Sequence, residues 1–228
     1  MNVPVYVTTC DRYVNRALRP FAWLFNRYWS SSQPVTVIGF QPPPYELPGN
    51  FSFFSAGADN GQKSWSTALI KAIQALRHEL FILFLDDYFL NQAVHVGGVA
   101  SLVEYVRLHP DVLRLDLTTD RLYAGGMYGI EDWGRYSIIE TPAGTPYQMS
   151  LQAGIWRAPL MLHVLEPEKS PWEVELQTSP PADMRVLGTR EEPVRYANVF
   201  KGGDPNNLLN LGELKAVDVE ELDKRGWL

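Results

Sequence analysis

The sequence has little cysteine, little histidine and no long apolar run. Cys10 is the single cysteine among 228 residues, so no internal disulfide can form and nothing requires an oxidising compartment. The four histidines, His78, His95, His109 and His163, show no metal-ligand spacing. No stretch reaches the ~18 apolar residues of a membrane helix, and the start of the chain does not resemble a secretion signal. These absences predict a soluble cytoplasmic protein and leave peripheral membrane contact open.

The balance of charge argues against one further class of protein. The chain has 20 Lys and Arg against 26 Asp and Glu, for a net charge of -6, and its basic residues form no cluster. A protein that holds nucleic acid by its phosphates needs such a cluster, so we do not expect a nucleic-acid partner. The hydrophobic content of 46% is enough for one sizeable core. We therefore expect a single domain over residues 1–228.

The most informative stretch is Phe81–Leu90, in which five apolar residues run directly into Asp86 and Asp87. An apolar run without alternation is typical of a strand buried on both faces of a parallel or mixed sheet. The two carboxylates then lie at the carboxyl end of that strand, where ligands bind in open α/β sheets. The alternative is an acidic turn in which one aspartate caps a helix.

Strands and helices alternate along the first half of the chain. The patterns predict strands at 3–9, 35–40, 51–55 and 81–85, and helices at 12–29 and 64–76. This order favours a three-layer α/β sandwich whose central sheet is mostly parallel.

The second half alternates less regularly. We expect a helix at 96–108, a strand at 112–117 and a long irregular loop at 118–134 that contacts an acceptor. The strands predicted at 136–141 and 147–156 are separated by a hairpin-like connection. Beyond them we expect a short helix at 158–165, a helix opened by Ser170, a late strand at 194–200 and a surface helix or tail at 208–228.

The carboxylate pair suits Mg²⁺ or Mn²⁺, and such a cation suits a diphosphate. A nucleotide-diphosphate sugar explains the combination best, because transfer from it needs a cation on the diphosphate and a carboxylate that deprotonates the acceptor hydroxyl. We expect Asp87 to bind the metal, and Asp86 to reach the ribose hydroxyls or a metal-bound water. Adjacent residues point to opposite faces only as far as the strand continues before it bends. The spacing of Asp86 and Asp87 therefore does not settle which carboxylate has which role.

Three further groups are candidates for contact with the nucleotide. Asp59 and Lys63 flank a turn that leads into a helix, where they can meet an anion or a uracil-like edge. Lys201 stands beside two glycines that permit a moving loop, and with Tyr196 and Asn198 it can close over the diphosphate. The simpler alternative for these groups is a solvated loop, with Lys201 an exposed lysine.

Three segments together carry a family resemblance: Val5–Tyr13, Phe84–Phe89, and Ser150–Trp156 followed by Ser170–Glu175. They resemble bacterial glycosyltransferases of the GT-A type, the small cytoplasmic enzymes found with lipopolysaccharide and capsule genes. The resemblance covers residues 3–200 in element order. It implies a GT-A-like domain with a nucleotide-binding part at 1–110, an acceptor-side part at 111–205 and a C-terminal helix or tail at 206–228.

The resemblance also implies roles for individual residues. Thr8, Thr9 and Asp11 would line the nucleotide pocket, and Asp86 and Asp87 would match the acidic metal motif. The carboxylates after Trp172 would include the catalytic base, and Glu173 is the first choice with Glu175 in reserve. Glu173 also completes a helix-capping box with Ser170, a structural role that is equally compatible with the sequence.

The chain departs from the family pattern at two points. Many relatives have one residue between the two acidic residues, whereas here Asp86 and Asp87 are adjacent. Many also supply a late histidine ligand, and the last histidine here is His163. Fewer protein groups would then hold the metal, or the enzyme would tolerate its absence.

The sequence therefore predicts an inverting, metal-assisted glycosyltransferase that moves a sugar, from a UDP-sugar in the first instance, to a hydroxyl acceptor such as a glycan or lipid-linked glycan. Two alternatives remain. A sugar-phosphate nucleotidyltransferase shares the sheet and the acidic residues, although Thr8–Arg12 is not the Gly-rich basic loop of that class. A non-catalytic glycan- or nucleotide-binding subunit is the other.

Overall fold

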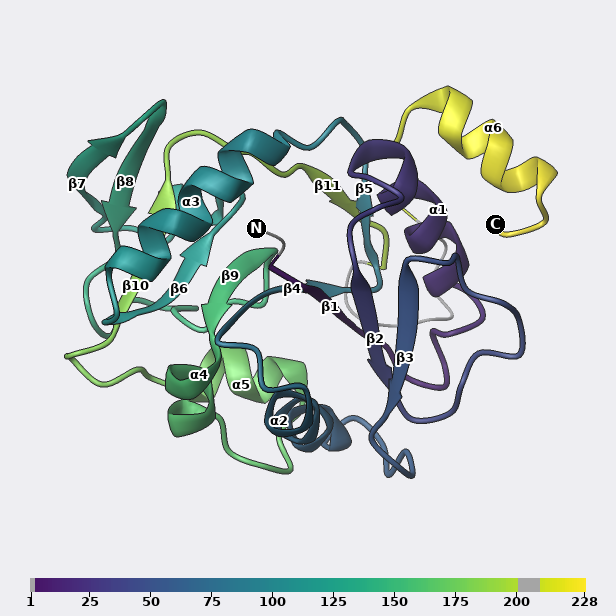
Figure 1. Ribbon diagram of the computed structural model, residues 1–228, viewed down its shortest axis with the longest axis horizontal. Helices are drawn as coiled ribbons and strands as arrows, with labels where there is room; N and C mark the ends of the chain where they lie inside the picture. Colours follow the sequence, from purple (N-terminus) through teal and green to yellow (C-terminus); the bar gives the residue numbers. More distant parts are fainter. Residues whose placement is uncertain (1–2, 201–209) are drawn as a thin grey trace.

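A nine-stranded sheet runs through the molecule in the computed structural model, which describes residues 3–200 and 210–228 (Figure 1). Its strands are β1 (Val5–Thr8), β2 (Val35–Gly39), β3 (Phe51–Ser55), β4 (Leu80–Leu85), β6 (Val112–Asp116), β7 (Tyr128–Trp133), β8 (Tyr136–Glu140), β9 (Gly154–Arg157) and β10 (Arg185–Thr189). They lie in the order β3-β2-β1-β4-β9-β6-β10-β8-β7. Only β8 and β9 run against the direction of the others, so the sheet is mostly parallel, as predicted.

The first four strands form the parallel part of the sheet. β1 lies between β2 and β4, with Val5 opposite Val35 on one side and Ile82 on the other. All four residues of β1 are buried, which is why its sequence is apolar and β-branched without polar alternation. The predictions for these strands are confirmed to within two residues, and Asp86 and Asp87 directly follow β4.

Helices cover both faces of the sheet (Figure 1). One face packs against α1 (Leu18–Tyr28) and α3 (Val96–Leu108), and the other against α2 (Ser64–Leu76), α4 (Ala158–Val164) and α5 (Pro171–Gln177). The predicted three-layer sandwich is therefore confirmed. The predicted bounds of α2 and α3 match, but α1 begins at Leu18 because the backbone turns around the Cys10 carbonyl, which accepts from the amides of Tyr13 and Val14.

The predicted pairing in the second half is wrong. The strand expected at 147–156 is reduced to β9, which pairs with β4 and β6 in the middle of the sheet. The strand before it, β8, pairs with β7 and β10 instead. Ile155 of β9 faces Ile82 on one side and Leu115 on the other, partners more than 35 residues away along the chain that a local pattern cannot reveal.

Several shorter elements also differ from the sequence prediction. Residues 118–134 contain a 3₁₀ turn, η1 (Asp120–Tyr123), and the edge strand β7, rather than one irregular loop. β10 was not predicted. A separate two-stranded sheet pairs β5 (Tyr88–Leu90), which was also not predicted, with β11 (Tyr196–Asn198), which confirms part of the late strand.

The C-terminal helix α6 (Ala216–Lys224) is attached to α1 by a buried carboxylate. Tyr28 Oη donates to Asp218 Oδ2 at 2.5 Å, and Arg27 Nε lies 2.9 Å from Asp218 Oδ1. The Asp218 side chain is fully buried. The helix alternative for this segment is thus confirmed. Among the helices of the described residues, none is long and apolar enough to cross a bilayer.

Replacement of Asp218 by alanine should destabilise the protein by roughly 2–4 kcal/mol, because it leaves the Tyr28 hydroxyl and Arg27 without their shared partner. Urea unfolding measures this change. Glu220→Ala is the matched control: it removes an exposed carboxylate of the same helix, which pairs with Lys224, and should cost about 0.5 kcal/mol or less. Equal losses in the two variants would contradict the role given to Asp218.

Candidate active site

A cavity of about 440 Å³ opens where β1, β2 and β4 end. This size is typical of small-molecule sites, and the carboxyl edge of a parallel sheet is the usual place for one. Its walls are formed by Thr8, Thr9, Cys10, Arg12, Tyr13, Ile38, Phe40, Asp59, Gly61, Gln62, Trp65, Ala68, Leu85, Asp87, Tyr88, Leu151, Gln152, Pro171, Trp172, Glu175, Asn198 and Phe200.

The part of the cavity wall next to the ends of β1 and β2 is largely apolar. Ile38 and Phe40 come from the end of β2, and Trp65 comes from the first turn of α2. Trp65 Nε1 donates to Thr8 Oγ1 at 3.0 Å, which fixes the indole against the end of β1. Asp59 adds a carboxylate to this wall. An apolar slot with one acceptor group at its edge can hold a planar base.

The two adjacent aspartates have different environments. Asp86 is buried, and its Oδ2 accepts from the Thr9 hydroxyl at 2.5 Å. Asp87 lines the cavity, whereas Asp86 is not among the lining residues. The bend after β4 therefore turns one carboxylate into the protein and the other towards the cavity, a division that the spacing left open.

Asp87 shares the cavity wall with Glu175. Burial raises the pKa of Asp87 from 3.8 to about 7, and the nearby Glu175 carboxylate adds to the shift. Burial also raises the pKa of Glu175, opposed by its hydrogen bond to Leu151 and by Arg114. Two carboxylates that are hard to ionise together make a site that favours either a bound cation or a shared proton.

The structure separates Glu173 from Glu175. Glu173 completes the predicted capping box: its Oε2 accepts from the Ser170 amide and hydroxyl, each at 2.8 Å, and its Oε1 lies 3.2 Å from Lys63 Nζ. These bonds, the backbone amide first, lower the pKa of Glu173 to about 2. It is absent from the cavity walls, whereas Glu175 is among them. Of the two candidate bases, the fold therefore places Glu175, the second choice, in the same cavity wall as Asp87.

Of the remaining candidates for nucleotide contact, some line the cavity and others do not. Thr8, Thr9 and Asp59 line the cavity. Asp11 does not, because its Oδ1 accepts from the Gln41 amide at 3.2 Å. Lys63 lines a smaller neighbouring pocket and pairs with Glu173, and Lys201 lies outside the described residues.

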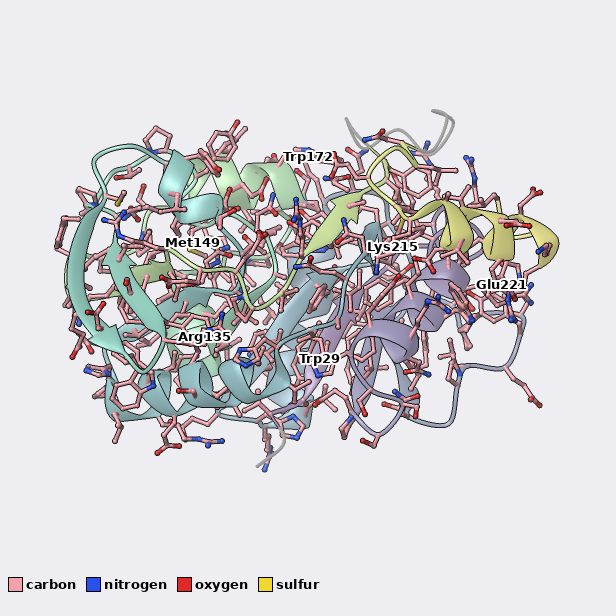
Figure 2. The ribbon with its side chains drawn as sticks, turned by 90° about the horizontal axis from the view of Figure 1, so that it is seen from above. Trp29, Arg135, Met149, Trp172, Lys215 and Glu221 are labelled. Atoms are coloured by element: carbon pink, nitrogen blue, oxygen red, sulfur yellow. The ribbon has the colours of Figure 1, made fainter. Side chains whose placement is uncertain are left out.

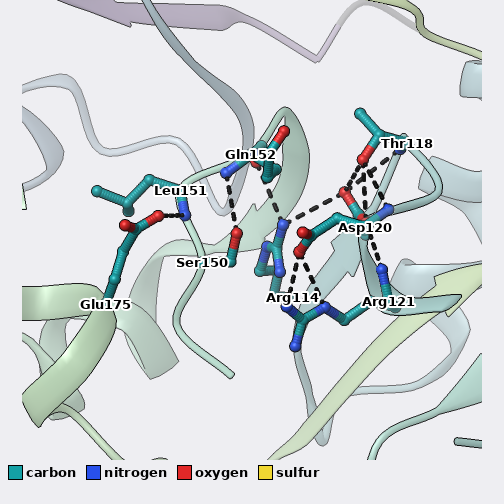
Figure 3. Close-up of polar contacts among 9 residues, drawn as sticks. Arg114, Thr118, Asp120, Arg121, Ser150, Leu151, Gln152 and Glu175 are labelled. Atoms are coloured by element: carbon teal, nitrogen blue, oxygen red, sulfur yellow. Dashed lines mark hydrogen bonds and ion pairs between the residues drawn. The ribbon is translucent and has the colours of Figure 1, made fainter. Parts of the chain in front are cut away.

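Glu175 is supported by a buried charge network that the sequence analysis missed (Figure 3). Leu151 N donates to Glu175 Oε1 at 2.7 Å, and the carbonyl of the next residue, Gln152, accepts from Arg114 Nη2 at 3.3 Å. Arg114 also contacts Asp116 Oδ1 at 3.2 Å, and both side chains are fully buried. The network therefore links β6 to the chain segment that holds Glu175.

Burial of this network shifts the pKa of both partners towards their neutral forms. Desolvation lowers the pKa of Arg114 and raises that of Asp116, and each partner opposes the other's shift. Asp116 also accepts from the Thr118 hydroxyl at 3.0 Å. Beside it lies Arg121, whose Cβ would be 2.7 Å from a Cβ added at Gly188, so the neighbouring strand must carry glycine there. The alternating Arg114-Leu115-Asp116 pattern was the only sequence signal for this cluster.

Two cavity residues outside the predicted set have clear chemical consequences. Arg12 brings a cation to the cavity wall, where it can contact an anionic ligand. Cys10 also lines the cavity, but burial, with a contribution from Asp86, raises its pKa to about 11. Cys10 therefore stays a thiol at neutral pH and is not an activated nucleophile.

The cavity offers a partial set of metal ligands. Across residues 3–200 and 210–228, no three His, Cys, Asp or Glu side chains converge as a metal-binding group. Mg²⁺ in enzymes is often bound by one or two carboxylates together with substrate phosphates. Asp87, a hard-oxygen donor at the cavity wall whose ionised form is disfavoured in the free protein, fits a cation of this kind.

The raised pKa of Asp87 predicts a pH-dependent gain in stability for Asp87→Asn. In the wild type the native state binds more protons than the unfolded state between pH 3.8 and about 7, so the protein loses stability as pH rises through this window. Asparagine does not titrate. The stabilisation by Asp87→Asn should therefore grow by roughly 2–3 kcal/mol from pH 5 to pH 8 in metal-free urea unfolding.

Glu173→Gln is the matched control for this measurement. The pKa of Glu173 is lowered from 4.5 to about 2, so its contribution to stability is present above pH 4.5 and is lost only as pH falls towards 2. The variant should be destabilised to a similar extent at pH 5 and pH 8. A pH-independent effect of Asp87→Asn would show that Asp87 is not held in a desolvated position.

Comparisons with known proteins show the fold. No protein-family model matches the sequence, and no curated protein matches it significantly. Among solved structures, the chain is similar to UTP-bound UGPase from Acinetobacter baumannii, with a TM-score of 0.52, 10% identity, and coverage of 98% of this chain and 94% of that one.

Two other similar structures align less closely. UDP-glucose pyrophosphorylase complexed with UDP-glucose has a TM-score of 0.48 and 9% identity, over 86% of this chain and 92% of that chain. S. aureus TarS 1-349 has a TM-score of 0.44 and 14% identity, over 82% of this chain and 60% of that chain. The match to the Acinetobacter structure shows that the chain has the α/β fold seen in nucleotide-diphospho-sugar transferases, with its large, mostly parallel sheet.

Proposed function

We propose that the protein is a GT-A-like glycosyltransferase that moves a sugar from a nucleotide-diphosphate sugar to an acceptor hydroxyl. The observation that carries the proposal is that Asp87 and Glu175 line one cavity, with an apolar slot and Trp172 in its wall. Donor binding, charge on a diphosphate and acceptor deprotonation each have a candidate group in this space.

The donor half of the site is formed by residues that precede position 110. The base would lie between Phe40 and Trp65, with Asp59 accepting from its edge, and Arg12 would contact the diphosphate. The name of the similar Acinetobacter baumannii structure includes UTP, which makes a UDP-sugar the first donor to test. We assign residues 1–110 to the nucleotide and residues 111–205 to the acceptor.

Asp87 would hold a divalent cation such as Mn²⁺ or Mg²⁺, which neutralises charge on the departing diphosphate. Asp86 would support Asp87 indirectly. Its hydrogen bond with Thr9 fixes the turn after β4 that directs Asp87 to the cavity. A role for Asp86 at the ribose would require its carboxylate to leave a buried position.

Glu175 would accept the proton of the acceptor hydroxyl. The Leu151 amide holds its Oε1, which leaves Oε2 for the acceptor. Its raised pKa makes Glu175 a stronger base than an exposed glutamate. In this arrangement Glu175 is the base and the acceptor hydroxyl is the nucleophile. The hydroxyl attacks the anomeric carbon from the side opposite the diphosphate, as in an inverting transfer.

The second candidate is a sugar-phosphate nucleotidyltransferase, because the fold is shared with UTP-bound UGPase over nearly the whole of both chains. That reaction joins a sugar phosphate to a nucleoside triphosphate and releases pyrophosphate. A non-catalytic binding subunit on the same fold is the third. Pyrophosphate release from UTP and a sugar phosphate would identify the second candidate, and donor binding without turnover over a broad acceptor panel would identify the third.

Variants at the three carboxylates should separate their roles. Asp87→Ala should remove the metal-dependent rise in melting temperature caused by a UDP-sugar. Glu175→Gln should keep that rise and lower turnover by roughly 10²- to 10⁴-fold, since general base catalysis is lost. Glu173→Gln should keep both donor binding and most of the turnover, because this residue caps α5.

Thermal shift with and without Mn²⁺, followed by a nucleoside-diphosphate release assay, measures these effects. Full activity of Asp87→Ala with metal removed would contradict the assignment of Asp87 as the metal ligand. Loss of turnover in Glu173→Gln, with normal turnover in Glu175→Gln, would reverse the assignment of the base.

A further inference from the structure

We propose that Trp172 forms the acceptor subsite of the cavity and that the acceptor is a pyranose sugar whose ring packs on the Trp172 indole. This inference rests on the proposed function and adds to it the chemical class of the acceptor. It assigns a residue that lay in a sequence segment resembling the family but had no role of its own there.

The spacing of two residues on α5 carries the argument. Trp172 and Glu175 are three positions apart on the helix and therefore lie side by side on its surface, with about 5–6 Å between their Cβ atoms. Both line the cavity. An acceptor whose hydroxyl reaches Glu175 therefore places the rest of its ring, about that distance away, against Trp172.

Trp172 is available for such a contact. Its side chain remains 42% exposed, although large aromatic residues are usually buried when packing alone requires them. Trp172 is the second residue of α5, and Figure 2 shows it at the surface of the molecule. Its indole offers the cavity a flat apolar face beside a carboxylate.

β11 supplies a polar group to the same cavity. Asn198 lines the cavity, and its side-chain oxygen is buried below the cavity surface, with no hydrogen-bond partner among the described residues. The Trp172 indole and the Glu175 carboxylate thus line one volume, which matches a pyranose ring with one apolar C–H face and hydroxyl groups at its rim.

The charges of the cavity disfavour other acceptors. Among the described residues, Arg12 is the one lysine or arginine in the wall, and we assign it to the donor diphosphate. The phosphate of a phosphate-bearing acceptor would lie near the carboxylates of Asp87 and Glu175, which repel its negative charge. The aromatic residues of 118–134, which the sequence suggested for acceptor contact, are not among the lining residues; Tyr128 lies on the edge strand β7.

Saturation-transfer NMR tests the inference directly. The probes are methyl glycosides of glucose, galactose, mannose and N-acetylglucosamine, each offered to the full chain with UDP and Mn²⁺, and their octyl counterparts at concentrations below micelle formation. We expect saturation at the ring C–H protons of at least one sugar in both forms. Trp172→Ala should weaken its affinity by about tenfold or more, the effect of losing one aromatic stacking surface.

Three controls distinguish stacking from a general disturbance of the site. Trp172→Phe should retain most of the affinity, because it keeps an aromatic face. Tyr128→Ala removes an exposed aromatic residue outside the cavity and should leave sugar binding unchanged. UDP affinity should be the same in all variants, which also confirms that Trp172→Ala is folded.

The outcomes separate the inference from the proposed function. Normal UDP binding with no sugar bound, with saturation confined to the octyl chain, or with undiminished sugar affinity in Trp172→Ala would overturn the acceptor subsite and leave the donor site standing. Absence of UDP binding in the wild type would instead overturn the proposed function on which the inference rests.

Discussion

The structure of the candidate site depends on the burial of one carboxylate at the end of a central strand. β4 is buried almost throughout, so the two aspartates that follow it emerge at the sheet edge with little freedom. The bond between Thr9 and Asp86 holds the first inside the protein. The turn that follows β4 directs the second, Asp87, towards the cavity. The cost of this placement is visible in the raised pKa of Asp87.

A second constraint connects the two halves of the sheet. β9 lies between β4 and β6, and the segment before it carries Leu151 and Gln152 into the cavity wall. Arg114 donates a hydrogen bond to the Gln152 carbonyl, and the Leu151 amide donates one to the Glu175 carboxylate. Buried charges of this kind are weak sources of stability, but they specify one arrangement of the chain. Here they fix the position of Glu175 in the cavity wall that it shares with Asp87.

Much of the first half of the fold could be predicted from the sequence, because it depends on local patterns. Continuous apolar strands and the bounds of α2 and α3 follow from periodicity alone, as does the capping box of Ser170 and Glu173. The position of Glu175 could not be predicted, since it depends on β9 entering the middle of the sheet between distant partners. The same capping box that was predictable removed Glu173 from the cavity wall. In the buried network, the bonds that join Asp116 to Arg114 and Thr118 are local, but the bond from Arg114 to the Gln152 carbonyl depends on the long-range pairing of β6 with β9.

A crystal structure of the protein with UDP and Mn²⁺ tests the central claim most directly. The account predicts the base in the slot between Phe40 and Trp65, an anomalous manganese peak about 2.0–2.2 Å from an oxygen of Asp87 and bridging to the diphosphate, and Glu175 facing the open side of the metal. Asp86 should remain bonded to Thr9. A metal held by Asp86, or a nucleotide bound outside the cavity, would contradict the account.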